Sequence, residues 1–120
     1  MNYGYARVST GGQSLESQLS QLTAQGCRVF AEKISGAESN RPELLRLMQT
    51  ITFGDVLIVT RLDRLARSTR DLLNIVATLG ERGAGLRSLA DVWADTTTPH
   101  GRLMLTLLGG IAEFERRQWV

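Results

Sequence analysis

Apolar residues in this chain follow two patterns that alternate along it. Short runs rich in strand-forming residues lie at 2–8, 28–34, 56–59 and 85–89. Between these runs, apolar residues recur three or four positions apart, as they do on one face of a helix. Because the run 56–59 is apolar at every position, it is typical of a strand buried on both faces of a parallel sheet. The alternation predicts an α/β fold with a mostly parallel, doubly wound sheet and flanking helices.

Three of the intervening stretches predict amphipathic helices. Their core-facing positions are expected to be Leu15, Leu19 and Leu22 in the first, Leu44, Leu45, Met48 and Ile51 in the second, and Leu72, Leu73, Val76 and Leu79 in the third. Pro42 suits the first turn of the second helix, and Ser68 or Thr69 can cap the third, which we expect to end at Gly83. Val92 and Trp93 indicate the start of one more strand.

The last apolar stretch differs from these three helices. From Arg102 to Phe114 almost every position is apolar or small. A helix packed on a single domain needs an apolar stripe about 100° wide, whereas this one would be apolar nearly all round. It is therefore either buried within its own domain or shared with a second subunit, and the small size of the domain favours sharing.

Composition indicates one ordinary globular domain. The chain has 120 residues, of which 42% are hydrophobic and 22% charged. Its net charge is only +2, but thirteen of the fourteen basic residues are Arg. Arginine favours planar, bidentate recognition of anions, although a GC-rich genome would produce the same bias. One Cys and one His exclude an internal disulfide and the usual zinc sites. Without a signal peptide or a long apolar run, we expect a cytoplasmic protein with no membrane association.

The stretch Thr60–Arg70 carries four of the arginines and directly follows the predicted central strand. A helical turn would separate its apolar and polar side chains, with Leu62, Leu65 and Ala66 on one side and Asp63, Arg64 and Arg67 on the other. Closely spaced guanidinium groups repel one another unless an anion lies between them, and their shape matches phosphate. The alternative is a solvated charged face with an Asp63–Arg67 pair, worth a few tenths of a kcal/mol. This stretch alone does not decide between the two.

Two other places in the chain are suited to hold a ligand. The first predicted strand runs into Ser9, Thr10 and two glycines, and α/β sheets place their ligand loops at the carboxyl ends of strands. Gln18, on the following helix, is spaced to face this loop. Arg41 precedes the second helix, where the helix dipole already favours anions.

Four segments of the chain, in this order, resemble the catalytic domain of the serine recombinases, the small resolvases and DNA invertases. They are Tyr5–Thr10, Ser35–Pro42, Leu62–Arg67 and Ala112–Arg116. Each motif is weak by itself, but the four together are specific, and the resemblance covers essentially the whole chain. It implies that Ser9 is a nucleophile that forms a phosphoserine bond to a DNA 5′ end.

The resemblance also implies roles for residues around Ser9. The expected phosphate-binding and acidic residues are Arg7, Arg41, Arg64, Arg67 and Asp63, and the supporting positions are Tyr5, Gln13, Gln18 and Glu32. Preplaced guanidinium groups would stabilise the charge that develops on the attacked phosphate, so no metal or other cofactor is expected. A seryl ester conserves the bond energy, so rejoining needs no ATP. Asp63 is the best carboxylate candidate for the proton of Ser9, but a structural Asp63 that pairs with neighbouring arginines remains an alternative.

The resemblance further implies a division of the chain into a catalytic core at 1–98 and the start of a long dimerisation helix at 99–120. Family members extend this helix and add a helix-turn-helix domain that reads DNA, and they act as dimers that form tetramers. Neither extension is present, so we expect the chain by itself to fold but not to recombine DNA. One alternative function is a non-catalytic remnant that dimerises through the last helix. A flavodoxin-like nucleotide binder is disfavoured because the glycine and P-loop fingerprints are missing.

Overall fold

The computed structural model describes residues 1–8, 15–33, 41–66 and 68–107. Ser9, Gln13 and Arg67, together with the stretch beyond residue 107, lie outside the described residues. Within them the elements follow in the order β1 (Asn2–Val8), α1 (Leu15–Ala24), β2 (Arg28–Lys33), α2 (Pro42–Thr50), β3 (Val56–Val59), the 3-10 helix η1 (Leu62–Arg64), α3 (Thr69–Glu81), β4 (Gly85–Ser88) and the 3-10 helix η2 (Val92–Ala94). Residues 99–107 are helical.

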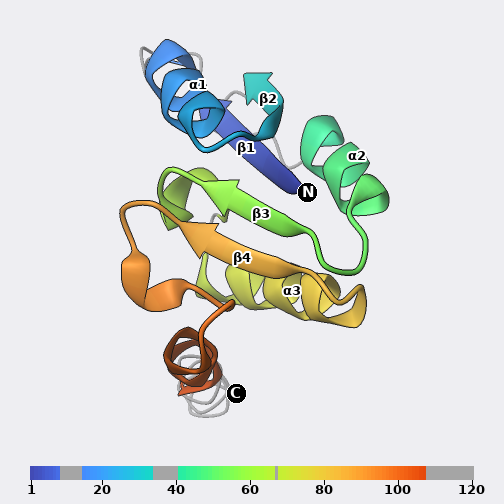
Figure 1. Ribbon diagram of the computed structural model, residues 1–120, viewed down its shortest axis with the longest axis vertical. Helices are drawn as coiled ribbons and strands as arrows, with labels where there is room; N and C mark the ends of the chain where they lie inside the picture. The colour runs from blue at the N-terminus through green and yellow to red at the C-terminus, as the bar shows by residue number, and fades with distance from the viewer. Residues whose placement is uncertain (9–14, 34–40, 67, 108–120) are drawn as a thin grey trace, which may run out of the picture.

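The described strands form one parallel sheet in the order β2-β1-β3-β4 (Figure 1). β1 pairs with β2 along nearly its whole length, but with β3 only from Asn2 to Gly4. Leu57, Ile58 and Val59 of β3 are completely buried. The prediction of a central strand covered on both faces is therefore confirmed.

Helices cover both faces of the sheet. On one face α1 packs Leu22 against Ala6 and Ile58. On the other, the larger part of the core joins α2, α3 and residues 99–107 to the sheet, through side chains that include Leu47, Leu79 and Leu105. Figure 1 shows α1 and α3 on opposite sides of the strands. The predicted α/β architecture, a parallel sheet with flanking helices, is confirmed.

Three expectations about the core and elements were wrong in detail. Leu45 is 58% exposed, because α2 turns Leu44, Leu47 and Ile51 inward at a spacing of three and four residues. In α3 the fully buried position between Leu72 and Leu79 is Ile75, whereas Leu73 is only partly buried. Val76 is also partly buried, but it packs against the core as predicted. Val92 and Trp93 belong to η2 instead of a strand.

The ends of α3 follow the predicted capping pattern. The Ser68 side chain accepts a hydrogen bond from the backbone N–H of Asp71 at 3.1 Å, which satisfies a donor in the first turn. After the last turn, Gly83 adopts φ +72°, the left-handed conformation that glycine takes without strain. Both boundaries of α3 were therefore readable from local sequence.

Candidate active site

The end of β1 is held in place by a side chain of α1. The backbone N–H of Arg7 donates to Oε1 of Gln18 at 3.2 Å, and Nε2 of Gln18 donates to the carbonyl of Arg7 at 3.0 Å. Because β3 pairs with β1 only as far as Gly4, the Gln18 amide bonds the backbone of Arg7 beyond the part of the strand that β3 pairs with. The chain is thus fixed one residue before Val8, which immediately precedes Ser9.

Two of the predicted phosphate-binding arginines hold the backbone of the arginine-rich segment that contains η1. Nη2 of Arg7 donates to the carbonyl of Asp63 at 2.8 Å. Nη1 of Arg41 donates to the carbonyl of Leu65 at 2.7 Å. These bonds come from β1 and from the start of α2, so the structure brings Arg7, Arg41 and the segment with Asp63 and Arg64 together at the carboxyl ends of β1 and β3.

The same segment is tied to the turn after β4. The backbone N–H of Leu62 donates to Oδ2 of Asp91 at 2.9 Å, and the Ser88 hydroxyl donates to the same oxygen at 2.8 Å. On its inner side, Leu65 is completely buried. The predicted apolar anchor is therefore confirmed, and the backbone that carries Arg64 is held on both sides.

Arg41 also pairs with an acid that sequence reasoning missed. Its Nη2 lies 2.9 and 3.0 Å from the two carboxylate oxygens of Asp71, and the two side chains are only 11% and 19% exposed. Asp71 therefore compensates part of the positive charge of Arg41 and fixes its position relative to α3. The only sequence signal was the position of Asp71 three residues after the cap Ser68, which predicted a helix start and not a partner for Arg41.

Asp63 pairs with Arg61, which was also not among the predicted site residues. Nη2 of Arg61 donates to Oδ2 of Asp63 at 2.8 Å, and both side chains are about three-fifths exposed (59% and 60%). Pairs this exposed are strongly screened by water and salt. The carboxylate thus stays accessible beside the site.

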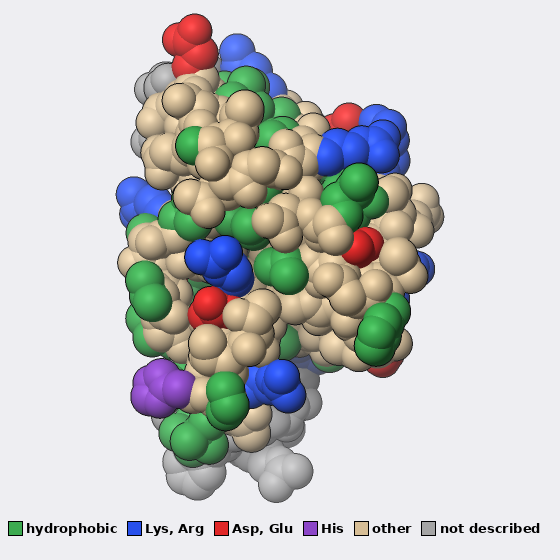
Figure 2. Space-filling view, viewed as in Figure 1, with side chains coloured by type: hydrophobic (Ala, Val, Ile, Leu, Met, Phe, Trp, Pro, Cys, Tyr) green, Lys and Arg blue, Asp and Glu red, His purple; other side chains and the backbone are tan. Residues whose placement is uncertain are grey.

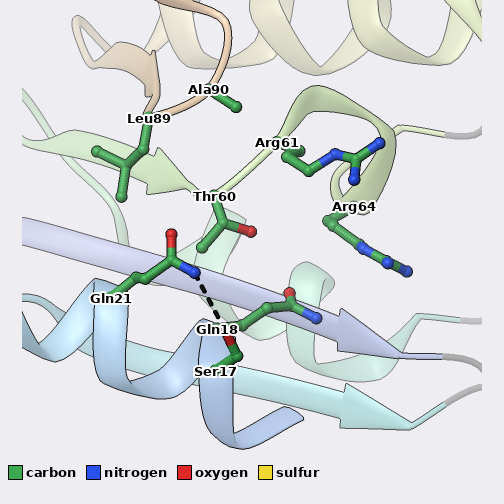
Figure 3. A pocket seen from close by; sticks show the side chains of 8 residues that line it. All are labelled: Ser17, Gln18, Gln21, Thr60, Arg61, Arg64, Leu89 and Ala90. Atoms are coloured by element: carbon green, nitrogen blue, oxygen red, sulfur yellow. Dashed lines mark hydrogen bonds between the residues drawn. The ribbon is translucent and has the colours of Figure 1, made fainter. Parts of the chain in front are cut away.

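A pocket of about 430 Å³ opens beside this segment (Figure 3). Its lining comes from α1, the residues after β3 and the turn after β4: Ser17, Gln18, Gln21, Thr60, Arg61, Arg64, Leu89 and Ala90. Figure 3 shows the Arg61 and Arg64 side chains at the same end of the pocket, away from Gln21 and Leu89. The pocket is therefore cationic at one end and faces the carboxyl end of the sheet.

Tyr5 and Glu32 lie beneath the site, inside the core. The fully buried Tyr5 hydroxyl donates to Oε2 of Glu32, which also accepts from the backbone N–H of Leu44 at 3.2 Å. Oε1 of Glu32 accepts from the N–H of Glu43 at 3.1 Å. Glu32 thus caps the N-terminus of α2, next to Arg41. Burial, followed by the bond to Glu32, raises the pKa of Tyr5.

We expect Glu32→Ala to lower the free energy of unfolding by about 3 kcal/mol, because it leaves the Tyr5 hydroxyl and two helix N–H groups without their acceptor. Glu32→Gln keeps acceptor oxygen and should cost less. Chemical denaturation measures both. The matched control is Glu43→Ala, which removes a carboxylate from the first turn of α2, paired with Arg46, but leaves the acceptors of the Tyr5 hydroxyl and of the helix N–H groups in place. A loss no larger than that of the control would show that Glu32 does not hold α2.

The same pair makes stability depend on alkaline pH. Because the pKa of Tyr5 is raised in the folded state, the native protein keeps a proton that the unfolded chain loses above about pH 10. The stability of the wild type should therefore fall as pH rises beyond that point. Tyr5→Phe should remove this part of the decline in a denaturation series from pH 8 to 11, and an unchanged decline would assign it to other groups.

Neither metal-binding clusters nor membrane spans occur in the described part of the chain. No group of three or more His, Cys, Asp or Glu side chains there could hold a metal ion. None of the helices within the described residues is long and apolar enough to cross a membrane. On the face in Figure 2, basic side chains lie in separate small groups among apolar and acidic ones.

Comparison with known proteins gives consistent results. The family model described as resolvase, N-terminal domain, matches residues 2–120. A resolvase of Clostridium perfringens is 42% identical over 97% of the chain and 64% of its own length. The serine recombinase gin of Escherichia phage Mu is 43% identical over 97% of the chain and 60% of its own length. The chain thus spans less than two thirds of these relatives.

A solved structure resembles the whole fold. The N-terminal catalytic domain of TP901-1 integrase superimposes with a TM-score of 0.82 at 36% sequence identity, covering 98% of this chain and 97% of that one. The fold is therefore shared with a domain that is described as catalytic.

Proposed function

Because the chain belongs to the resolvase N-terminal domain family, we propose that it is the catalytic domain of a site-specific DNA recombinase. In this proposal the substrate is a DNA phosphodiester, which is cleaved and rejoined through a bond to Ser9. We also propose that the protein acts in the cytoplasm, where it would meet DNA. The observation that carries the proposal is the convergence of Arg7 and Arg41 on the backbone that bears Arg64, at the end of the strand that leads into Ser9.

The proposed reaction is a reversible transfer of a phosphoryl group. The Ser9 oxygen attacks the phosphorus, the bond to the 3′ oxygen breaks, and a 5′-phosphoserine bond forms. The serine proton passes to a base, for which the accessible carboxylate of Asp63 is our candidate. The 3′ oxygen takes up a proton from water and leaves as a hydroxyl, so the net number of protons is unchanged. Attack by this hydroxyl reverses the step, so the energy of the broken bond is retained and no ATP is needed.

The arginines would supply the electrostatic part of catalysis. Arg7, Arg41, Arg64 and Arg67 are assigned to the non-bridging phosphate oxygens, whose negative charge increases in the transition state. A guanidinium keeps its charge at any working pH and offers N–H groups in a fixed plane. Gln18, Glu32 and Tyr5 would act indirectly, through the backbone of Arg7 and the start of α2. Gln13, in the segment between β1 and α1, is retained as a supporting residue.

We also propose that residues 1–98 form the catalytic core and that 99–120 begin a dimerisation helix, with tetramers in the full-length synaptic complex. This is supported by Leu103 and Leu107, which are 56% and 52% exposed, while Leu105 on the same helix is buried. The same exposed leucines favour the second candidate function, a dimerisation module without catalysis. DNA cleavage distinguishes the two.

The test joins the chain to the C-terminal part of the Mu recombinase gin, so that DNA recognition comes from the relative. The chimera is incubated with a nicked DNA site in EDTA, and covalent protein–DNA adducts are trapped with denaturant. We expect a metal-independent adduct whose phosphoserine maps to Ser9 by peptide mass spectrometry. A strict requirement for magnesium, or an adduct on another residue, would contradict the proposed reaction.

A further inference from the structure

The pocket beside the site contains side chains that the proposed reaction does not use. It shares Gln18 and Arg64 with the site, but it also exposes Ser17, Gln21 and Arg61, and Thr60 forms part of its wall. None of the described residues that line it is acidic. Its lining thus combines two guanidinium groups with neutral hydroxyl and amide groups, which is the chemistry of an anion site.

The guanidinium of Arg61 is oriented by Asp63 but keeps most of its N–H donors available. Its side chain is 59% exposed and its hydrogen bond within the described residues goes to Asp63, at 2.8 Å. A guanidinium has five N–H donors, so most of those on Arg61 remain available to a second acceptor. The backbone N–H of Arg64 donates to the carbonyl of Arg61 at 3.1 Å, closing the turn that brings the two side chains to the same end of the pocket (Figure 3).

The other walls suit the sugar–phosphate backbone of a nucleic acid. Nε2 of Gln21 donates to Oγ of Ser17 at 3.3 Å, a long bond that an incoming phosphate oxygen can replace. Leu89 and Ala90 give the opposite wall an apolar surface (Figure 3). The end of the pocket with Arg61 and Arg64 therefore attracts an anion, and the wall with Leu89 and Ala90 offers apolar contact to the carbon atoms of a deoxyribose.

We propose that this pocket binds the phosphodiester next to the scissile one, with Arg61 on its phosphate and Leu89 and Ala90 against its sugar. Asp63 is then a positioning residue for Arg61 as well as a neighbour of the reacting phosphate. The inference rests on the proposed function, because Arg64 in the same pocket is assigned to the scissile phosphate. It adds a second contact to DNA that helps to place the strand.

The chain carries a matched control for Arg61. Arg46 is also exposed, at 63%, and pairs with a nearby acid, Glu43, at 2.7 Å, but it lies on α2 and does not line the pocket. Loss of either charge lowers the net charge of the protein by one. Only loss of Arg61 should remove a specific phosphate contact.

The test is a salt titration of the binding of a short, fluorescently labelled DNA duplex to the unmodified 120-residue chain, measured by anisotropy from low to moderate salt. Each phosphate contact contributes about 0.9 to the slope of log affinity against log salt concentration. We expect Arg61→Gln to reduce this slope by about 0.9 and to weaken binding at low salt, and Arg46→Gln to leave both near the wild-type values. Circular dichroism checks that each variant is folded.

Arg64→Gln separates failure of this inference from failure of the proposed function. A slope that falls in Arg64→Gln but not in Arg61→Gln would overturn the second contact and leave the scissile-phosphate site intact. Equal decreases of the slope in Arg61→Gln and Arg46→Gln would show that only the net charge matters, and they would also overturn the second contact. If the wild type does not bind, or if neither Arg64→Gln nor Arg61→Gln changes the slope, the phosphate site of the proposed function fails as well.

Discussion

Replacing Ser9 with alanine in the chimera should abolish the covalent protein–DNA adduct and reduce cleavage by about 10⁴-fold or more, because no other group takes over from a missing nucleophile. Ser9 follows Val8 at the end of β1, where the Gln18 amide bonds both backbone groups of Arg7. The strand is thereby held directly before the proposed nucleophile in the sequence. Gel analysis of trapped adducts on nicked DNA measures the effect.

The matched control for this substitution is Thr10→Ala. Thr10 carries a hydroxyl in the next position of the chain, so it tests whether a neighbouring hydroxyl is sufficient. We expect Thr10→Ala to keep the adduct. An adduct that persists in Ser9→Ala and disappears in Thr10→Ala would transfer the nucleophile to the neighbouring residue.

Arg64→Lys should lower the cleavage rate by about 10²- to 10³-fold while the protein stays folded. Lysine keeps the positive charge but loses the planar pair of donors that a phosphate accepts bidentately. Arg7 and Arg41 donate to the backbone carbonyls on either side of Arg64, those of Asp63 and Leu65. The backbone around position 64 should therefore stay in place when Arg64 is replaced by lysine. Single-turnover cleavage and a thermal melt separate the two effects.

Arg70→Lys is the control for this second exchange. Arg70 is exposed in the first turn of α3 and does not line the pocket. It should tolerate lysine with cleavage near the wild-type rate. Near-normal cleavage in Arg64→Lys as well would identify the segment as a solvated charged face, the alternative that its sequence left open.

Local sequence patterns determined the main architecture of this protein. The alternation of strand-like and helical stretches predicted the parallel sheet, since both signals depend on residues within one element. The fully apolar run of β3, the Ser68 cap and the glycine after α3 were readable for the same reason. The four ordered motifs also identified the family, although Ser9 and Arg67 lie outside the described residues.

The tertiary structure decided which side chains meet. Arg41 and Asp71 are 30 residues apart, and Glu32 reaches the start of α2 from 11 residues earlier in the chain. Such pairs depend on how the elements pack, and no periodicity within a helix or strand records them. Packing also decided which face of α2 points to the core. Leu44 and Leu45 are equally apolar, and only the docking of the helix on the sheet buries Leu44 and exposes Leu45. Sequence thus determined the elements and the chemistry available at the strand ends, whereas packing selected the partners that hold this chemistry in place.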